Sequence, residues 1–404
     1  MKRGLFVLSM ALLLATACGN PEQERKEALR ATARETLDRA VEQSLRMAES
    51  LADQPGRLPK SIKEGELEHA SSAWWTSGFF PGELWNLYAY SHDERLLPWA
   101  EEYTARVEKE QYTTGNHDVG FMIFCSFGNG YRVTGNEAYL DVIHTAANSL
   151  STRFSPETGA IRSWNSSPDR PWRYTVIIDN MMNLELLMWS AERFGDPRLR
   201  EIAVSHADVT LENHFRPDGS SYHVVSYDPE TGAVEYRQTA QGYADESAWA
   251  RGQAWGLYGY TMMYRFTHDA RYLEQAKRIA AFILHHPRLP EDKIPYWDFD
   301  APDIPEAPRD ASAGAIICSA LLELCDYVEA PLAAEYRTVA EQQIESLCSP
   351  AYLAEPGTNC NFLLKHGVGN YPKGTEVDVP LTYADYYLVE ALLRYLQGAE
   401  NEPA

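Results

Sequence analysis

Positive charge is in short supply in this sequence. Its 404 residues include 36 Lys and Arg against 58 Asp and Glu, a formal net charge of −22. Proteins that bind nucleic acid depend on clustered Lys and Arg, because these side chains neutralise the phosphates. The shortage therefore excludes nucleic acid as a partner. Hydrophobic residues make up 45% and charged residues 23% of the chain, which excludes a disordered or fibrous protein.

Cysteine is scarce as well. Five cysteines follow Cys18, and they form no CxxC pair and no His/Cys spacing typical of zinc. We expect most of them to be small buried hydrophobic residues, and we expect neither a metal nor a cofactor. Nothing in the sequence indicates a protein partner.

Long hydrophobic runs are absent after the N-terminus. The run from Leu5 to Leu14 follows Lys2 and Arg3; it is shorter than the roughly 20 residues of a membrane helix and is typical of a signal peptide. The small residues before Cys18 resemble the processing box of bacterial lipoproteins. We predict a lipoprotein signal peptide over residues 1–17, a lipidated anchor segment over 18–24, and an exported protein anchored to a bacterial membrane. Ordinary cleavage, with Cys18 incidental, is the alternative.

A linker rich in Pro and Ser is also missing, so residues 25–400 are predicted to form one domain. Amphipathic segments with a helical period recur along it, separated by Gly, Asp, Asn or Pro. These segments predict about twelve helices, near residues 23–52, 80–91, 94–109, 118–133, 137–152, 180–194, 198–213, 246–266, 270–285, 311–328, 332–347 and 381–397.

Twelve helices in successive hairpins predict an all-α fold, an (α/α)6 barrel in which inner and outer helices alternate. An open superhelix of helix pairs is the alternative. Irregular spacing of the hairpins and four long loops between them argue against it. We expect these loops to cluster at one mouth of the barrel; they span residues 153–178, 214–245, 286–310 and 349–379.

Two acidic residues stand at the starts of predicted helices. Asp118 begins the fourth helix, and Asp179 begins the sixth after three β-branched apolar residues. A helix N-terminus stabilises an anion, whereas apolar neighbours raise the pKa of a carboxyl and keep its proton available. Since both helices would belong to the inner ring, we expect the two carboxyls to face one pocket, as in glycosidases. A simple N-cap is the alternative for each.

Ser247, Arg251 and Trp255 form a third candidate group. They are four residues apart and so share one face of the predicted helix over 246–266. Arg can bind a sugar carboxylate through two hydrogen bonds while Trp stacks on the ring. An Arg–Glu pair within the protein, with Trp as a core residue, is the alternative.

Aromatic residues amount to 12% of the chain, which suits a carbohydrate cleft or a large aromatic core. Trp75, Trp164 and Tyr371, the last close to Lys373, are supporting candidates. His223 is predicted to lie on a loop, where a histidine is more often structural or exposed than catalytic.

Several motifs occur in an order that resembles one enzyme family. From about Trp75 to Leu396 the chain is similar to the unsaturated glucuronyl hydrolases of glycoside hydrolase family 88. The resemblance implies an (α/α)6 barrel and a hydrolase acting on the unsaturated uronates that polysaccharide lyases leave. The motifs are WTSGFFPGELW, HDVGF, IIDNMMNLELLMW, DGSSYHVVSYDPETG, WARGQAWGLYG, YWDFDAPDIPEAPRDASA and DYYLVEALLR.

The resemblance also implies roles for individual residues. Asp179 corresponds to the catalytic proton donor and Asp118 to the second essential carboxylate. The segment around Lys373 keeps the lysine but lacks serines that some members carry there for sulfated substrates. The residues that match the family's substrate pocket are Trp75, Trp164, His223, Gln241, Ser247, Trp249, Arg251 and Trp255.

The reaction implied by the family is a hydration. Asp179 would protonate carbon 4 of the 4,5-unsaturated uronate, water would add at carbon 5, and the resulting hemiketal would open and release the aglycone. The leading hypothesis is a glycoside hydrolase acting on small glycosaminoglycan disaccharides of chondroitin, hyaluronan or heparin type. The alternatives are an unsaturated rhamnogalacturonyl hydrolase acting on pectin fragments and a glycan-binding lipoprotein without activity.

Overall fold

The computed structural model describes residues 21–400. The predicted signal peptide and Cys18 lie outside the described residues. Within this part of the chain, no helix combines the length and the apolar character that crossing a bilayer requires.

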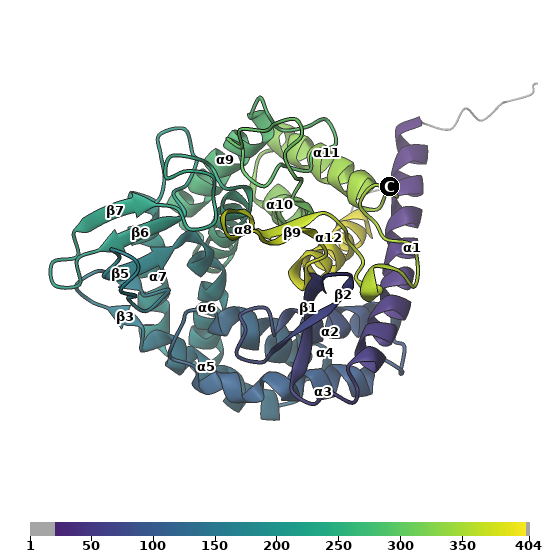
Figure 1. The fold of residues 1–404 in the computed structure, drawn as a ribbon, viewed down its shortest axis with the longest axis horizontal. Helices are drawn as coiled ribbons and strands as arrows, with labels where there is room; N and C mark the ends of the chain where they lie inside the picture. Colours follow the sequence, from purple (N-terminus) through teal and green to yellow (C-terminus); the bar gives the residue numbers. More distant parts are fainter. Residues whose placement is uncertain (1–20, 401–404) are drawn as a thin grey trace, which may run out of the picture.

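The described residues form twelve α-helices arranged as two concentric rings (Figure 1). The even-numbered helices pack against one another as the inner ring, and the odd-numbered helices cover them from outside. Helix α12 contacts both α1 and α2, which closes the ring. The (α/α)6 barrel is therefore confirmed and the open superhelix is excluded. The bounds are α1 Pro21–Ser50, α2 Phe79–Ser91, α3 Leu97–Val107, α4 Asn129–Thr134, α5 Ala138–Ser151, α6 Leu184–Phe194, α7 Pro197–Asn213, α8 Ala250–Thr267, α9 Ala270–His285, α10 Ala311–Leu324, α11 Ala330–Leu347 and α12 Thr382–Glu400.

Burial distinguishes the two rings. The inner helix α8 is buried on every side from Ala250 to Met263. The outer helix α9 buries a single stripe, with Tyr272, Ala276, Ile279 and Ile283 spaced three or four residues apart. A helix with one apolar stripe covers a core, whereas a helix apolar all round lies within it.

Three of the four predicted loops contain short strands that were not predicted from the sequence. The strands are too short for a clear alternation of apolar and polar residues, and Val224–Tyr227 is buried on both faces. Residues 53–78, for which no structure was predicted, also form a hairpin. The antiparallel pairs are β1 Arg57–Lys63 with β2 Glu66–Ser71, β3 Phe154–Ser155 with β4 Ala160–Ile161, and β8 Gly367–Asn370 with β9 Thr375–Val379; β5 Tyr174–Ile177, β6 Val224–Tyr227 and β7 Val234–Gln238 form a sheet in that order.

Three predicted helix starts differ from the structure. The fourth predicted helix is a π-helix, η2 (Gly120–Gly128), that continues into α4. The sixth opens with a 3₁₀ turn, η3 (Ile178–Asn183), before α6. The eighth begins only at Ala250, because Trp249 has an extended backbone and bridges to Asp298.

Candidate active site

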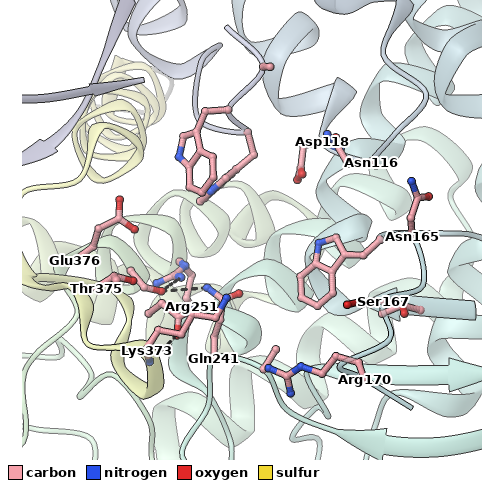
Figure 2. Close-up of a pocket in the computed structure, with 18 of the residues that line it drawn as sticks. Asn116, Asp118, Asn165, Ser167, Arg170, Gln241, Arg251, Lys373, Thr375 and Glu376 are labelled. Carbon is pink, nitrogen blue, oxygen red and sulfur yellow. Dashed lines mark hydrogen bonds between the residues drawn. The ribbon is translucent and has the colours of Figure 1, made fainter. Parts of the chain in front are cut away.

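A cavity of about 620 Å³ opens where the inner helices have their N-termini. Asp118 lies on one wall and Arg251 on another (Figure 2). Segments from β1, from the β3–β5 region and from β8–β9 complete the walls. Six of the predicted site residues line this cavity: Trp75, Asp118, Trp164, Gln241, Arg251 and Lys373.

The starts of the fourth and sixth predicted helices are pressed together at the base of this cavity. Gly120 allows the approach, because a Cβ atom at this position would lie 2.7 Å from the Cα of Asn183. The backbone N–H of Phe121 donates to Oδ1 of Asn183 at 2.9 Å. The close contact brings Asp118, just before η2, towards Asp179 in η3.

Asp118 is an acid with a shifted pKa. Its side chain is 13% exposed, and Nε2 of His117 lies 3.4 Å from its Oδ1. Burial raises the pKa of Asp118 to about 7, while the guanidinium of Arg153 acts to lower it. Burial also lowers the pKa of His117 to about 3, so this imidazole is neutral. Asp118 makes no side-chain capping bond to η2, which excludes the simple N-cap.

Asp179 lies deeper, outside the residues that line the cavity. It is 9% exposed, and its Oδ2 has no hydrogen-bond partner. Burial raises its pKa to about 7; Arg251 and Trp255 oppose the rise, and the charge of Asp118 adds to it. It does not cap η3 either. Two carboxyls that repel each other ionise in separate steps, so an ionised Asp118 favours the protonated form of Asp179.

Arg251 is fully buried at the first turn of α8. Its Nη2 donates to the carbonyl of Gly369 at 2.7 Å. Its Nη1 donates to the carbonyl of Val368, and it also donates to Oδ2 of Asp310, which lies 3.3 Å away. The predicted alternative, an internal ion pair, is thus partly correct, with Asp310 in place of a Glu. Arg251 still borders the cavity, and its Nε has no partner.

The predicted common face of Ser247, Arg251 and Trp255 does not form, because Ser247 precedes the helix. Its hydroxyl donates to Asp298 at 2.7 Å instead. Tyr371 stacks on Trp297 with ring centroids 4.3 Å apart. Neither Ser247 nor Tyr371 lines the cavity.

His223, Trp249 and Trp255 form a buried layer behind the lining. The His223 ring packs on Trp249 at 4.5 Å, and the Arg251 guanidinium lies 4.5 Å from the Trp249 ring. Pairing of β5 with β6 joins this layer to Asp179, since the N–H of Ile178 donates to the carbonyl of His223 at 3.0 Å.

Several residues of the site were not predicted from the sequence. Lys60 lines the cavity from β1 and pairs with Glu68 at 3.0 Å and Glu376 at 3.3 Å. Arg170 lines it from the segment between β4 and β5, with its guanidinium 4.8 Å from the Trp172 ring. Both lie outside helices, where the helical pattern carries no signal.

A second cavity, of about 490 Å³, lies towards the C-terminal ends of the inner helices. Four of its charged side chains form ion pairs, Arg265 with Glu185 at 2.5 Å and Arg394 with Glu390 at 3.7 Å, while Arg132 donates to Asn86 at 2.7 Å. The acid pair Asp118 and Asp179 belongs to the other end of the barrel, which makes the first cavity the candidate active site.

Comparison with known proteins decides the family. The sequence model of the family described as Glycosyl Hydrolase Family 88 matches residues 53–395. The chain belongs to glycoside hydrolase family 88. The resemblance inferred from the motifs is therefore confirmed, and the protein is a glycoside hydrolase.

Individual family 88 relatives are similar over most of their length. An unsaturated glucuronyl hydrolase of Formosa agariphila is 46% identical over 321 residues, which are 79% of each protein. The crystal structure of an unsaturated glucuronyl hydrolase specific for heparin is 47% identical, with a TM-score of 0.89 over 92% of this chain and 98% of that one. A mutant of the Streptococcus agalactiae enzyme, in complex with dGlcA-GalNAc6S, is 30% identical, with a TM-score of 0.77 over 91% and 92%.

Proposed function

We propose that the protein releases 4,5-unsaturated uronic acid from the non-reducing end of glycosaminoglycan disaccharides made by lyases. The observation that carries this proposal is the pair of buried carboxyls, Asp118 and Asp179, whose pKa values both rise to about 7 beside the buried cation Arg251. Hydration of an enol ether needs a proton donor near neutral pH and a charge that supports the cation formed next to the ring oxygen.

In this proposal Asp179 protonates carbon 4 of the unsaturated ring. Positive charge then develops at carbon 5, where the ionised Asp118 stabilises it. Water adds there and gives up one proton to the carboxylate that Asp179 has become. The hemiketal opens and the aglycone leaves. Arg251 attracts the uronate carboxylate, and Trp75 and Trp164 offer flat apolar faces to the sugar rings.

Disaccharides of heparin type are the favoured substrates. Identity to the heparin-specific enzyme is 47%, against 30% for the enzyme in complex with dGlcA-GalNAc6S. Lys373 and Arg170 lie on opposite walls of the cavity (Figure 2), and within the described residues neither side chain has an ion-pair partner. Two unpaired cations suit an aglycone that carries sulfate. The pectin and non-catalytic alternatives are not favoured.

A panel of lyase-generated disaccharides from heparin, chondroitin, hyaluronan and pectin tests the substrate class. Hydration removes the conjugated alkene, so loss of its ultraviolet absorbance reports turnover. We expect the highest kcat/KM with a heparin disaccharide. Turnover of the pectin disaccharide alone would contradict the proposal, and so would no turnover by folded protein on any member.

We further propose that the enzyme is exported and anchored through lipid on Cys18. The signal-like N-terminus and the small residues before Cys18 support this. Fractionation of cells that express the full chain provides the test. Wild-type protein is expected in the membrane fraction and Cys18→Ser outside it; equal partition of both would overturn the anchor.

A further inference from the structure

Arg153 connects two walls of the active-site cavity. It lies two residues after the end of α5 and is 9% exposed. Its Nη1 donates to the carbonyl of Thr114, in the segment that leads to Asp118. On the other side, its Nε donates to the carbonyl of Arg162 at 2.7 Å, its Nη2 to that of Ser163 at 3.3 Å, and both Nη atoms to Oδ1 of Asn165 at 3.3 Å.

All of these acceptors are neutral oxygens. Within the described part of the chain, no carboxylate forms an ion pair with Arg153. A buried guanidinium without a counter-charge is costly, and its positive potential extends to nearby ionisable groups. The acidic groups on which it acts are Tyr174 and Asp118. The phenol of Tyr174 donates to the carbonyl of Arg153 at 2.8 Å, and burial raises its pKa, so it stays neutral. The carboxyl that Arg153 attracts is that of Asp118, and the attraction is mutual.

The other charges around this carboxyl do not replace Arg153. His117, its immediate neighbour, is neutral at physiological pH. Asp179, in η3, carries no positive charge, and the charge of Asp118 raises its pKa. Arg251 acts on Asp179. Arg162 lies beside Arg153 but does not contribute to the shift at Asp118.

We propose that Arg153 is a positioning residue that fixes the segment carrying Asp118 and, through its unpaired charge, favours the ionised form of Asp118. Without that charge, burial acts on Asp118 unopposed, and its anion becomes less favourable. The inference rests on the proposed function for its kinetic consequence, but the ionisation of Asp118 exists with or without substrate.

Arg162 offers a matched control for the bonding role. Its Nε donates to the carbonyl of Trp164 at 3.1 Å, and its Nη2 donates to Ser166 at 2.7 Å and to the carbonyl of Arg173 at 2.8 Å. Both arginines thus form hydrogen bonds to the segment 162–166, but only the charge of Arg153 lowers the pKa of Asp118. Arg162→Met therefore loosens the same wall but leaves in place the charge of Arg153, which acts on Asp118.

The first experiment compares pH profiles of kcat/KM for wild type, Arg153→Met, Arg153→Lys and Arg162→Met. Removing the charge raises the pKa of Asp118, so the acidic limb is expected to move up by about one pH unit in Arg153→Met. The loss of activity is then roughly tenfold greater on the acidic side than at the optimum. Arg153→Lys should restore the limb, and Arg162→Met should leave it in place. A uniform loss at every pH, or the same shift in Arg162→Met, would overturn the proposal. Should Arg153→Met fail to fold, Arg153→Gln keeps polar contacts without charge and is read in the same way.

The second experiment needs no substrate. In an Asp179→Asn background, Asp118 is titrated by NMR with ¹³C-labelled aspartate carboxyls, and its signal is assigned by its loss in Asp118→Asn. A higher pKa in Arg153→Met or Arg153→Gln than with Arg153 present supports the inference, and an equal pKa overturns it. Inactivity of the wild type on the disaccharide panel would count against the proposed function alone.

Discussion

Nε2 of His223 lies 3.7 Å from Oδ2 of Asp179. The other ring nitrogen, Nδ1, accepts the backbone N–H groups of Ala240 at 3.1 Å and Gln241 at 3.2 Å. A nitrogen that accepts cannot carry the proton, and burial lowers the pKa of His223 well below its ordinary value. The neutral ring therefore holds its proton on Nε2, facing the carboxyl that is proposed to protonate the substrate.

This geometry predicts that His223→Gln lowers kcat about 10- to 100-fold. At 3.7 Å the two groups form no hydrogen bond in this structure. Once Asp179 has given up its proton it is an anion, to which the Nε2–H is expected to donate, and losing a hydrogen bond to a charged group costs about 1.5–3 kcal/mol. His206→Gln is the matched control, because His206 is also buried and accepts the N–H of Ile161 through Nδ1 at 2.9 Å. Steady-state kinetics should show loss of kcat in the first variant and near-normal kcat in the second. An equal loss of kcat in His223→Gln and His206→Gln would indicate that His223 has only a structural role.

Both carboxyls are predicted to be essential. Asp179→Asn and Asp118→Asn should fold normally and lose at least about a thousandfold in rate, since each removes an acid–base group or its charge. Asp269→Asn, at the N-cap of the outer helix α9, tests the effect of the same substitution away from the site and should remain active. Turnover like that of the wild type in either site variant would remove that residue from the mechanism.

The raised pKa of Asp179 predicts a pH-dependent stability. The folded protein holds this proton up to about pH 7, whereas the unfolded chain releases it near the ordinary value of 3.8. The contribution of Asp179 is therefore fully favourable below that ordinary pKa and is lost as the pH rises to about 7. Asp179→Asn has no such loss, so its stability relative to wild type should grow between about pH 4 and pH 7, by the order of 2–4 kcal/mol. Urea unfolding across that range gives the difference, and a gap independent of pH would contradict the shift.

Arg251→Lys is predicted to raise KM at least about tenfold with a smaller effect on kcat. Lysine keeps the charge but loses the planar set of donors that reaches Val368, Gly369 and Asp310; a tenfold change corresponds to about 1.4 kcal/mol. Arg265→Lys, in the second cavity, provides a control with the same chemistry. An unchanged KM in Arg251→Lys would argue against a role in binding the uronate carboxylate.

The sequence was sufficient for the barrel and for placing the helix starts that carry Asp118 and Asp179 close together. The prediction that both carboxyls face one pocket was only half correct, because Asp118 lines the cavity and Asp179 does not. Helical periodicity repeats over hundreds of residues, and helices of the same ring share a direction, so two helix starts could be placed at one mouth. The face shared by Ser247 and Arg251 was wrong because Trp249 takes an extended conformation that depends on its bridge to Asp298. The partners of Arg251 lie over a hundred residues away, at Val368 and Gly369, and local spacing carries no information on such contacts.

Arg153 illustrates the same limit. A single arginine after a helix fits no motif, and its acceptors are mostly backbone carbonyls, which any residue supplies. Its unpaired charge becomes visible only once the fold shows which carboxyl groups surround it.

Protonation of carbon 4 by Asp179 is the step on which the proposed reaction depends. Turnover of an unsaturated heparin disaccharide in deuterium oxide, quenched early and analysed by NMR, tests it most directly. For the wild type we expect deuterium on one face of carbon 4, because a single fixed carboxyl delivers it. For Asp179→Asn we expect no such product. Release of the amino sugar with deuterium on both faces equally, or with none at carbon 4, would contradict it.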